Sequence, residues 1–438
     1  MPGQGNRDHH LSKVDPELAA LLHKQIRAES STLKMIPSEN FAQFAVLEAA
    51  GSILTNKYCE GYPGARYYEG NEIVDEIEHL AIERAKSLFD AEHANVQPYS
   101  GSPANQAVYR ALAAGGAKVM GMPVPAGGHI THGWGVSFSG TDYVPVHYGP
   151  NPQTGLLDYD EIRTIARRER PRMIWVGGTS YPRIFDYAKF AEIAAEIEAY
   201  LVADIAHING LIIAGVHPNP VPCCDVVTST SHKMLRGPRA GFILSKIEDR
   251  YQKKHSPESK LNLAKRIDRA VFPGLQGGPH MNVIAAMAVT FKEAATEAFR
   301  EYGRQIAKNC KRLAEKLLER GYRLVSGGTD NHLLVMDFRD SPYSGKQVAK
   351  ALAQAGIICN FNMVPGDPRK PLVTSGVRMG TPALTSMGMK EPEMELIAGW
   401  IDGVCRHIED LDETAGRIHA EITDLCAQFP IPGIRGKS

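Results

Sequence analysis

The chain has 438 residues, more than one compact hydrophobic core usually holds, so two or three structural units are expected. Apolar residues make up 43% and charged residues 22%, the balance of an ordinary globular protein. Because Lys plus Arg and Asp plus Glu both number 49, no net charge draws the chain to nucleic acid or to an anionic membrane.

The cysteines indicate which compartment the protein occupies. Seven are scattered along the chain without the spacing of a metal site, and Cys223 and Cys224 form the only close pair. An odd number without paired spacing argues against a disulfide framework, and reduced thiols are typical of a reducing compartment. The first residues are polar and are not followed by the apolar stretch of a signal peptide or a membrane span. We therefore expect a cytoplasmic protein.

The first half of the chain alternates between two apolar patterns. Apolar residues at helical spacing predict amphipathic helices over 72–90 and 186–199. Short apolar runs predict strands at 118–122, 173–176, 201–203, 225–228 and 241–244. Strands that alternate with helices indicate a mostly parallel sheet covered on both faces.

The pattern changes in the last third of the chain. A long apolar helix is followed by one that carries Ile306, Cys310, Leu313 and Leu317 and ends at Gly321. Strands are expected at 323–326 and 333–337, with helices to the end. We therefore predict an N-terminal arm over 1–45, a large domain over 46–295 and a smaller α+β domain over 296–438.

The segment from Asp225 to Arg239 carries the strongest chemical signal. A predicted strand runs into hydroxyl residues, then His232 and Lys233, then a Gly-Pro turn flanked by arginines. A lysine there lies at the carboxyl end of a strand, where open α/β sheets bind their ligands. Neighbours that lower its pKa would suit a Schiff-base lysine, although a solvated turn lysine is an equally simple interpretation of this segment alone.

Asp204 makes the first interpretation more specific. It ends the predicted strand at 201–203, upstream of Lys233. Pyridoxal 5′-phosphate (PLP) needs a carboxylate against its pyridine nitrogen, because the protonated ring is the electron sink for a carbanion. A strand-end aspartate also often caps a helix, but the combination with Lys233 favours the cofactor. His207 is a candidate contact for the cofactor ring or its phenolic oxygen.

A phosphate cradle is predicted where a loop enters a helical stretch at three small residues, Ser100, Gly101 and Ser102. Backbone N–H groups and hydroxyls at a helix N-terminus bind anions, although the same sequence forms ordinary capping turns. Two glycines at 127 and 128 would permit close approach to a ligand, and His129 is a candidate to stack on a flat ring. A lone histidine is more often structural, so this part of the hypothesis depends on the rest.

Several longer stretches carry a family resemblance. They are residues 36–41 (IPSENF), 55–68 (TNKYCEGYPGARYY), 91–98 (AEHANVQP), 271–279 (VFPGLQGGP) and 373–378 (VTSGVR), together with the Lys233 segment. Through them the chain resembles the serine hydroxymethyltransferases, which are fold-type I PLP enzymes. The resemblance implies an aspartate-aminotransferase-like α/β fold. Its large domain would hold a mostly parallel seven-stranded sheet between helices, beside a smaller α+β C-terminal domain.

The resemblance also implies a cofactor site. PLP would be joined to Lys233 as an aldimine, with further contacts from Ser100, Gly101, Ser102, His129, Thr179, Asp204, His207, Thr230 and His232. Three residues resemble those that reach the phosphate of a neighbouring subunit, namely Tyr58, Gly277 and Gly278. That match implies a homodimer at least, and a tetramer is also compatible with it.

The implied substrates are L-serine and tetrahydrofolate, converted to glycine and 5,10-methylenetetrahydrofolate by Cα–Cβ cleavage through a quinonoid intermediate. Arg378 resembles the arginine that forks onto the substrate carboxylate. The rest of the implied amino-acid pocket is Ser38, Tyr68, His207 and Glu60, and the implied folate contacts are Glu60, Tyr67, Val124, Gly128, Ile130, Asn362 and Leu372. Implied catalytic residues are Lys233, Glu60, Asp204, His129 and Tyr68, with Glu60 as general acid/base. No metal, nucleic acid or membrane partner is implied.

The folate positions depart from the family pattern. Val124, Pro125 and Ala126 replace a stretch that usually carries a leucine and a histidine, Ile130 replaces a leucine, and Leu372 replaces a phenylalanine. Two alternatives therefore stay open: a hydroxymethyltransferase for an α-substituted serine such as α-methylserine, and a folate-independent aldolase for β-hydroxy amino acids. A catalytically silent binding homologue is disfavoured because the full set of predicted catalytic groups is present.

Overall fold

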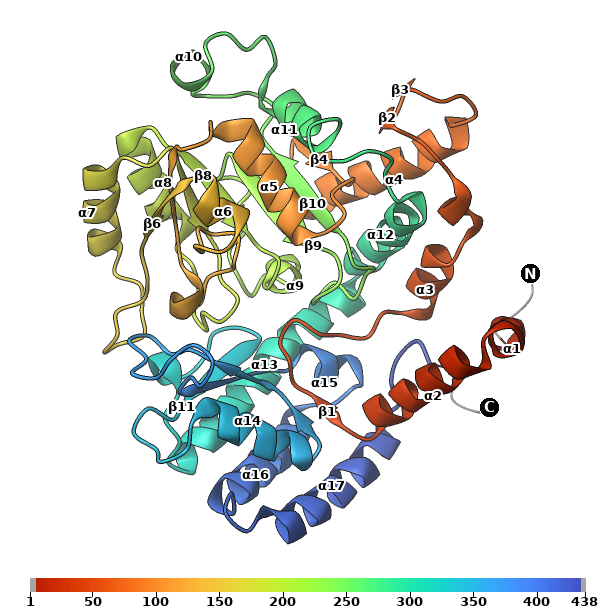
Figure 1. Ribbon diagram of the computed structural model, residues 1–438, viewed down its shortest axis with the longest axis vertical. Coiled ribbons are helices and arrows are strands. Elements are labelled where there is room, and N and C mark those ends of the chain that lie inside the picture. The colour runs from red at the N-terminus through yellow and green to blue at the C-terminus, as the bar shows by residue number, and fades with distance from the viewer. Residues whose placement is uncertain (1–4, 435–438) are drawn as a thin grey trace.

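The computed structural model describes residues 5–434, and a seven-stranded sheet forms the centre of its larger part (Figure 1). The strand order is β4-β10-β9-β8-β7-β5-β6. The strands are β4 (His93–Asn95), β5 (Lys118–Gly121), β6 (Val144–His147), β7 (Met173–Val176), β8 (Tyr200–Asp204), β9 (Val226–Thr230) and β10 (Gly241–Ser245). All neighbours run parallel except β10, which is antiparallel to β4 and to β9. The predicted mostly parallel sheet is confirmed.

Helices cover both faces of this sheet because successive strand residues point to opposite sides. In β7, Met173 and Trp175 belong to the hydrophobic core under α5 (Gly101–Leu112) and α11 (Leu263–Val271). Ile174 and Val176 belong to the core of the opposite face. That core includes residues of α4 (Glu72–Phe89), α7 (Tyr159–Glu169), α8 (Tyr187–Ile197), α9 (Asn209–Ile213) and α12 (Met281–Ala294). Two-sided burial explains why the central strands read as continuous apolar runs.

A separate hydrophobic core lies in the C-terminal part. It surrounds a three-stranded antiparallel sheet of order β11-β14-β13, made by β11 (Leu333–Asp337), β13 (Asn360–Asn362) and β14 (Gly376–Gly380). Its helices are α13 (Glu297–Glu319), α14 (Gly345–Gln354), α15 (Pro382–Ser386), α16 (Glu391–Arg406) and α17 (Leu411–Gln428). The boundary at residue 296 stays a prediction, because Phe299 and Ile306 of α13 pack into the core of the large sheet while Cys310, Leu313 and Leu317 of the same helix pack into this one. Part of the predicted arm joins the second core, because β1 (Leu33–Lys34) pairs in parallel with β12 (Ile357–Ile358).

The N-terminal helices project from the body of the molecule (Figure 1). They are α1 (Gly5–Val14) and α2 (Pro16–Ser30), and Asp15 caps α2 by accepting a hydrogen bond from the Leu18 backbone. Between them and the large sheet lie α3 (Phe44–Ala50), the 3₁₀ turn η1 (Ile53–Asn56) and the hairpin β2 (Gly61–Tyr62) and β3 (Ala65–Arg66). The remaining short elements are η2 (Val124–Ala126), α6 (Phe138–Thr141), α10 (Gln252–His255) and η3 (Val325–Gly327).

One predicted strand is wrong. Residues 323–326 form no strand: Leu324 makes a single isolated bridge to Met336, and a 3₁₀ turn begins at Val325. Ser326 has a left-handed backbone with φ of 58°, and its carbonyl accepts a hydrogen bond from Arg183 Nη2 at 2.5 Å. Because Arg183 occupies the Ser326 carbonyl that a neighbouring strand would use as acceptor, residues 323–326 pair with β11 only at Leu324.

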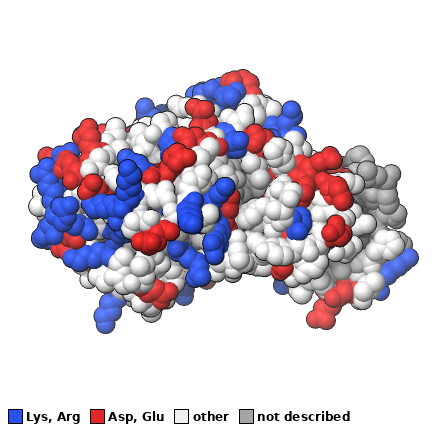
Figure 2. All heavy atoms as spheres, turned by 90° about the horizontal axis from the view of Figure 1, so that it is seen from above, with Lys and Arg blue, Asp and Glu red and all other residues white. Residues whose placement is uncertain are grey.

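Surface charge is mixed. Figure 2 shows basic side chains gathered at the left of the upper face with acidic side chains among them. Helix α7 lies on this side of the molecule, and its Arg163 and Arg167 both pair with Glu196 of α8, at 2.9 and 2.6 Å. Such pairing leaves little net field over the helix. Within residues 5–434, no helix is long and apolar enough to cross a membrane.

Candidate active site

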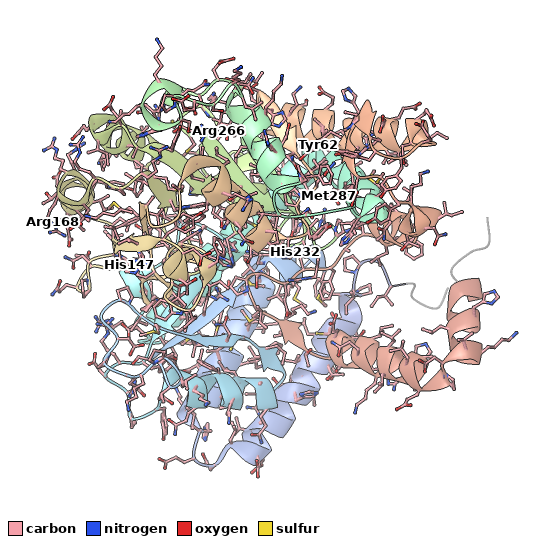
Figure 3. The ribbon with its side chains drawn as sticks, turned by 45° about the horizontal axis from the view of Figure 1, so that its top comes forward. Tyr62, His147, Arg168, His232, Arg266 and Met287 are labelled. Atoms are coloured by element: carbon pink, nitrogen blue, oxygen red, sulfur yellow. The ribbon has the colours of Figure 1, made fainter. Side chains whose placement is uncertain are left out.

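Strands β8 and β9 bring Asp204 and the Lys233 segment to one edge of the large sheet. In their parallel ladder Asp204 lies opposite Thr228, so the chain leaves β9 beside the carboxylate. The following turn is fixed by the Gly237 N–H, which donates to the Ser231 carbonyl at 2.7 Å, and by Asn40 Nδ2, which donates to the Lys233 carbonyl at 3.1 Å. In Figure 3 His232 of this turn lies near the middle of the molecule, between the sheet and the C-terminal helices.

A cavity of about 470 Å³ opens at this edge, a volume typical of small-ligand sites. Twelve predicted residues line it: Ser38, Ser100, Gly101, Ser102, His129, Thr179, His207, Thr230, His232, Lys233, Asn362 and Arg378. Glu39 and Arg239 also line it, although no role was predicted for them from the sequence. An adjoining cavity of about 30 Å³ shares His129 and Lys233 with the first and reaches Asp204. The fold thus brings residues of the large sheet and residues of the small C-terminal sheet to one cavity.

Lys233 is a buried amine whose charge is disfavoured. Burial is the main cause, and the nearby Arg378 and Arg239 add to it, so the pKa of Lys233 is lowered to about 8 although Asp204 opposes the shift. A lysine with this pKa is partly uncharged near neutrality, which is the form that attacks a carbonyl. The solvated-turn interpretation is therefore wrong.

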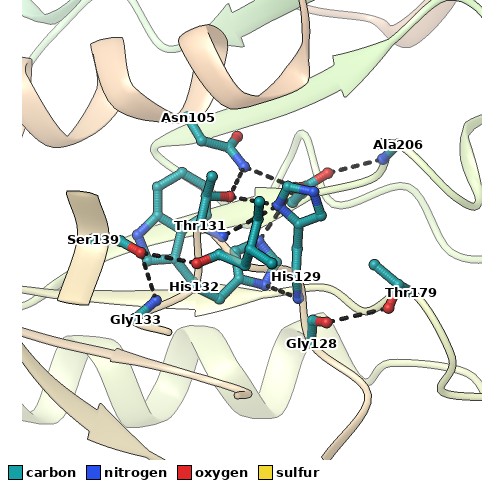
Figure 4. Close-up of polar contacts among 12 residues, drawn as sticks. Asn105, Gly128, His129, Thr131, His132, Gly133, Ser139, Thr179 and Ala206 are labelled. Atoms are coloured by element: carbon teal, nitrogen blue, oxygen red, sulfur yellow. Dashed lines mark hydrogen bonds and ion pairs between the residues drawn. The ribbon is translucent and has the colours of Figure 1, made fainter. Parts of the chain in front are cut away.

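Asp204 is held as a carboxylate by hydrogen bonds from Asn105, His132 and Ala206, which Figure 4 labels. Its Oδ2 accepts hydrogen bonds from Asn105 Nδ2 at 2.9 Å and from His132 Nε2 at 3.2 Å, and its Oδ1 accepts from the Ala206 backbone at 3.0 Å. Burial alone would raise the pKa of Asp204, but the His132 hydrogen bond and the nearby His129 and Lys233 lower it below its usual range. An ionised carboxylate remains available to a protonated ring nitrogen.

The groups that support Asp204 were not predicted from the sequence. His132 stacks on Trp175, with ring centroids 5.4 Å apart. Asn105 Nδ2 also donates to Thr131 Oγ1 at 2.8 Å, and the same hydroxyl lies 2.7 Å from His129 Nδ1. The network therefore ties the candidate stacking histidine to the aspartate. Burial lowers the pKa of His129 to about 4, so its ring is neutral.

The loop that carries His129 allows only glycine at one position. A Cβ added to Gly128 would lie 1.6 Å from the Met122 carbonyl oxygen. Thr179 holds the same loop: its N–H donates to the Gly127 carbonyl at 2.7 Å and its Oγ1 to the Gly128 carbonyl at 3.1 Å. The glycine pair at 127 and 128 therefore lets two loops lie in direct contact beside the cavity.

The predicted phosphate cradle lies at the start of α5. Ser100 is the N-cap residue and makes no side-chain capping bond, so its hydroxyl is not used by the helix. Gly101 is close to Thr230, whose Cγ2 would lie 2.8 Å from an added Cβ. Among the described residues, Thr230 Oγ1 and His232 Nδ1 are buried polar atoms without a hydrogen-bond partner. Unpartnered buried polar atoms that can donate a hydrogen bond, beside a helix N-terminus, fit an anionic group such as the PLP phosphate.

Arg378 enters the cavity from the small sheet. It lies on β14, where its Nε donates to Asn360 Oδ1 at 3.0 Å and its Nη1 to the Thr179 carbonyl at 2.5 Å. Burial lowers its pKa to about 10, so the guanidinium stays charged at neutral pH. Among the described residues, neither of these hydrogen bonds uses its Nη2. Asn360 is a supporting residue that was not predicted from the sequence.

The predicted folate positions separate in space. Asn362 lines the cavity, and its Nδ2 donates to Ser180 Oγ at 3.2 Å and to the Met363 carbonyl at 2.7 Å. Val124 lies in η2, and Ile130 is 48% exposed. Leu372 is 76% exposed and lies outside the cavity lining. Three of the positions that depart from the family pattern are thus peripheral to the cavity in one subunit.

A second cluster gathers the remaining predicted residues away from Lys233. Tyr58 donates to Glu60 Oε1 at 3.3 Å and meets Tyr68 edge-on with centroids 5.2 Å apart. An added Cβ at Gly277 would lie 3.1 Å from Glu60 Oε1, and one at Gly278 would lie 3.4 Å from the Tyr58 ring. Tyr58 and Tyr68 are 58% and 47% exposed, and Tyr67 beside them is 72% exposed. The structure brings these residues to each other and does not bring them to the cavity of the same chain.

Comparison with known proteins assigns the family. The family model described as serine hydroxymethyltransferase matches residues 11–401. The chain belongs to the serine hydroxymethyltransferase family. Serine hydroxymethyltransferase 2 of Mesorhizobium japonicum is 66% identical over 99% of both chains. The serine hydroxymethyltransferases of Acidothermus cellulolyticus and Sorangium cellulosum are 52% and 53% identical over 97% of both chains.

Serine hydroxymethyltransferases are PLP-dependent one-carbon transferases of fold-type I, so the predicted family, fold class and enzyme class are confirmed. The family pattern also explains why residues of the cavity could be predicted from the sequence, because the matching stretches contain Ser38, Arg378 and the Lys233 turn. Relatives named for the serine reaction favour the main predicted activity over its alternatives. Individual residue roles remain predictions.

Proposed function

We propose that this chain interconverts L-serine plus tetrahydrofolate and glycine plus 5,10-methylenetetrahydrofolate, with PLP as its cofactor. The observation that carries the proposal is the convergence of Lys233, Asp204 and Arg378 on adjoining cavities at one sheet edge. A buried amine of lowered pKa, an ionised carboxylate and a buried guanidinium form a site for a cofactor aldehyde, a ring nitrogen and an amino-acid carboxylate.

Each group has a distinct task in this proposal. Lys233 would hold PLP covalently, Asp204 would pair with its ring nitrogen and His129 would pack against the ring, because all three line the smaller cavity. Ser100, Ser102 and the unpartnered Thr230 and His232 would bind the phosphate. Bound in this way, PLP supplies the electron sink that stabilises negative charge at Cα when the Cα–Cβ bond breaks.

The chain's own residues orient the substrate and move protons. Arg378 binds the serine carboxylate, and its hydrogen bonds to Asn360 and Thr179 fix the direction of the guanidinium. Ser38 completes the amino-acid pocket, and Asn362 contacts folate. Lys233 exchanges protons with the amino group of the substrate. Glu60 acts as general acid/base at the hydroxymethyl oxygen.

A homodimer is part of the proposal, because Glu60 does not reach the cavity of its own chain. We assign Tyr58, Glu60, Tyr68, Gly277 and Gly278 to the site of a second copy. Support comes from exposed apolar side chains on the same stretch of the chain, which a second copy would cover: Leu47, Ile53, Tyr67, Ile73 and Leu80, exposed by 43%, 81%, 72%, 72% and 45%.

Free thiols at all seven cysteines support a cytoplasmic, reducing location.

The test measures glycine release from L-serine by purified PLP-loaded protein, with and without tetrahydrofolate. We expect release that depends on folate and is lost in Lys233→Ala. Lys246→Ala is a matched control, because Lys246 also lies just after a strand of the sheet but pairs with Glu92 at 3.3 Å. Folate-independent release would favour the aldolase alternative, and faster turnover of α-methylserine than of serine would favour the α-substituted substrate. A protein that binds no PLP would overturn the proposal.

A further inference from the structure

Two buried histidines meet where the large and small sheets face each other. His207 follows β8, and His332 directly precedes β11. His207 Nδ1 lies 3.3 Å from His332 Nε2, with ring centroids 5.5 Å apart. Both residues are buried, at 6% and 0% exposure. His207 also lines the cavity, whereas His332 does not.

Both rings are neutral. Burial lowers the pKa of His207 well below its usual range and that of His332 to about 3. The charged and titratable groups Lys233, Arg378, His129 and His217 oppose protonation of the pair, while the carboxylates of Glu39 and Asp204 line the same cavities as His207. Two neutral imidazoles can share one hydrogen bond, in which one ring donates and the other accepts.

The surroundings of His332 decide which ring donates. Its Nδ1 is buried and has no hydrogen-bond partner among the described residues. A proton on Nδ1 would therefore leave a buried N–H unsatisfied, which native proteins tolerate more rarely than an unused acceptor lone pair. The proton of His332 must then lie on Nε2, which donates to Nδ1 of His207. His207 in turn carries its own proton on Nε2.

We propose that His332 is a positioning residue that fixes His207 as the Nε2–H tautomer and so presents a permanent hydrogen-bond donor to the cavity. Nε2 of His207 has no partner among the described protein groups, and the residue lines both adjoining cavities. The ligand chemistry that this donor recognises is an anionic oxygen. Under the proposed function, on which this inference rests, the oxygen belongs either to the phenolic group of PLP or to the substrate carboxylate.

The direct test uses full-length, PLP-loaded protein labelled with ¹⁵N-histidine. Long-range ¹⁵N–¹H correlation spectra report which ring nitrogen of each histidine carries a proton, and His207→Asn and His332→Gln assign the two sets of signals. We expect bare Nδ1 and protonated Nε2 in both residues. A protonated Nδ1 in His207 would overturn the inference. The measurement is made on the unsubstituted protein and needs no variant to be active.

Variants of His332 separate positioning from simple packing. Gln places an amide near the position of the imidazole Nε2 and keeps the hydrogen bond, whereas Leu removes it. We expect His332→Leu to speed PLP release if the oxygen belongs to the cofactor, or to raise KM for serine if it belongs to the substrate, by about tenfold. His332→Gln should stay within about twofold of the unsubstituted protein. Equal losses in both variants, or no change in either quantity, would contradict the proposal.

A matched control is available in His217, another buried histidine that faces the pair from outside the cavity. It lies 3.1 Å from the Pro218 carbonyl and accepts a hydrogen bond from the Phe185 N–H at 3.3 Å. His217→Gln should lower stability without changing the His207 tautomer, PLP release or KM. If the tautomers are as expected but the protein does not cleave serine, the proposed function fails and the assignment of His332 stands.

Discussion

Lys233 is the residue whose chemistry depends most directly on its surroundings. Its pKa is lowered to about 8, mainly by burial. Because only the uncharged amine attacks the PLP aldehyde, the rate of covalent attachment to cofactor-free protein should rise with pH through about 8 and then level off. Stopped-flow absorbance after mixing with PLP measures that rate. A rise that continues to the ordinary lysine pKa of about 10.4 would contradict the predicted environment.

Residues that have a distinctive chemistry could be predicted from the sequence. The residues that hold them in place by hydrogen bonds could not. A lysine after a strand and an aspartate ending the previous one point to PLP without any structure. His132 and Asn105 act only through Asp204, and nothing in the local sequence shows that the three segments meet. The one available signal for His132 was its position three residues after His129 in a loop already singled out for ligand binding.

Strand pairing explains how the small domain orients its arginine. Asn360 on β13 lies opposite Arg378 on β14 and accepts its Nε hydrogen bond. Asn360→Ala should free the guanidinium and raise KM for serine by about tenfold, with kcat changed far less. Asn362→Ala, two residues along the same strand, is the matched control and should affect KM for tetrahydrofolate. If both variants raise KM for the same substrate, the two asparagines do not serve separate substrates.

The loop between β5 and β6 depends on close backbone contact. At Gly128 an added Cβ would lie 1.6 Å from a backbone oxygen, whereas at Gly135 in the same loop it would meet nothing within 4 Å. Gly128→Ala should therefore lower the free energy of unfolding by about 3 kcal/mol, and Gly135→Ala by less than about 1 kcal/mol. Urea unfolding followed by circular dichroism measures both. Equal losses would show that the loop relaxes around the methyl group.

Elements buried on both faces were the easiest to predict, because their apolar runs are continuous. The bounds of the central strands β7, β8 and β9 agree with the predicted bounds within one or two residues. The edge strands β4 and β6 were missed, because edge strands are short and lack that run. The wrong strand at 323–326 has the right composition, but Arg183 takes the Ser326 carbonyl from a segment far away in sequence.

At the scale of the whole molecule, the predicted site is divided between two surfaces. One cavity holds Lys233, while Glu60 and Tyr58 lie in a separate exposed cluster. The exposed apolar side chains named under the proposed function, together with Leu18, Leu21 and Leu22 of α2, are an apolar area that the proposed second copy would cover. This arrangement could not be derived from the sequence physically, because alternation of apolar residues reports burial within one chain. Only the family resemblance implied a shared site.

A two-fold dimer that shares its sites makes a specific prediction for mixed subunits. Lys233→Ala and Glu60→Gln should each be inactive alone. When equal amounts are unfolded and refolded together, half of the dimers combine the two chains, and each of these has one intact site, so about a quarter of the unsubstituted activity should return. Mixing Lys233→Ala with Asp204→Asn is the control: both residues serve the cavity of their own chain, so every site keeps a defect and no activity returns. No recovery in the first mixture would show that Glu60 serves its own subunit, and recovery in the control would show that Lys233 and Asp204 do not serve the same cavity.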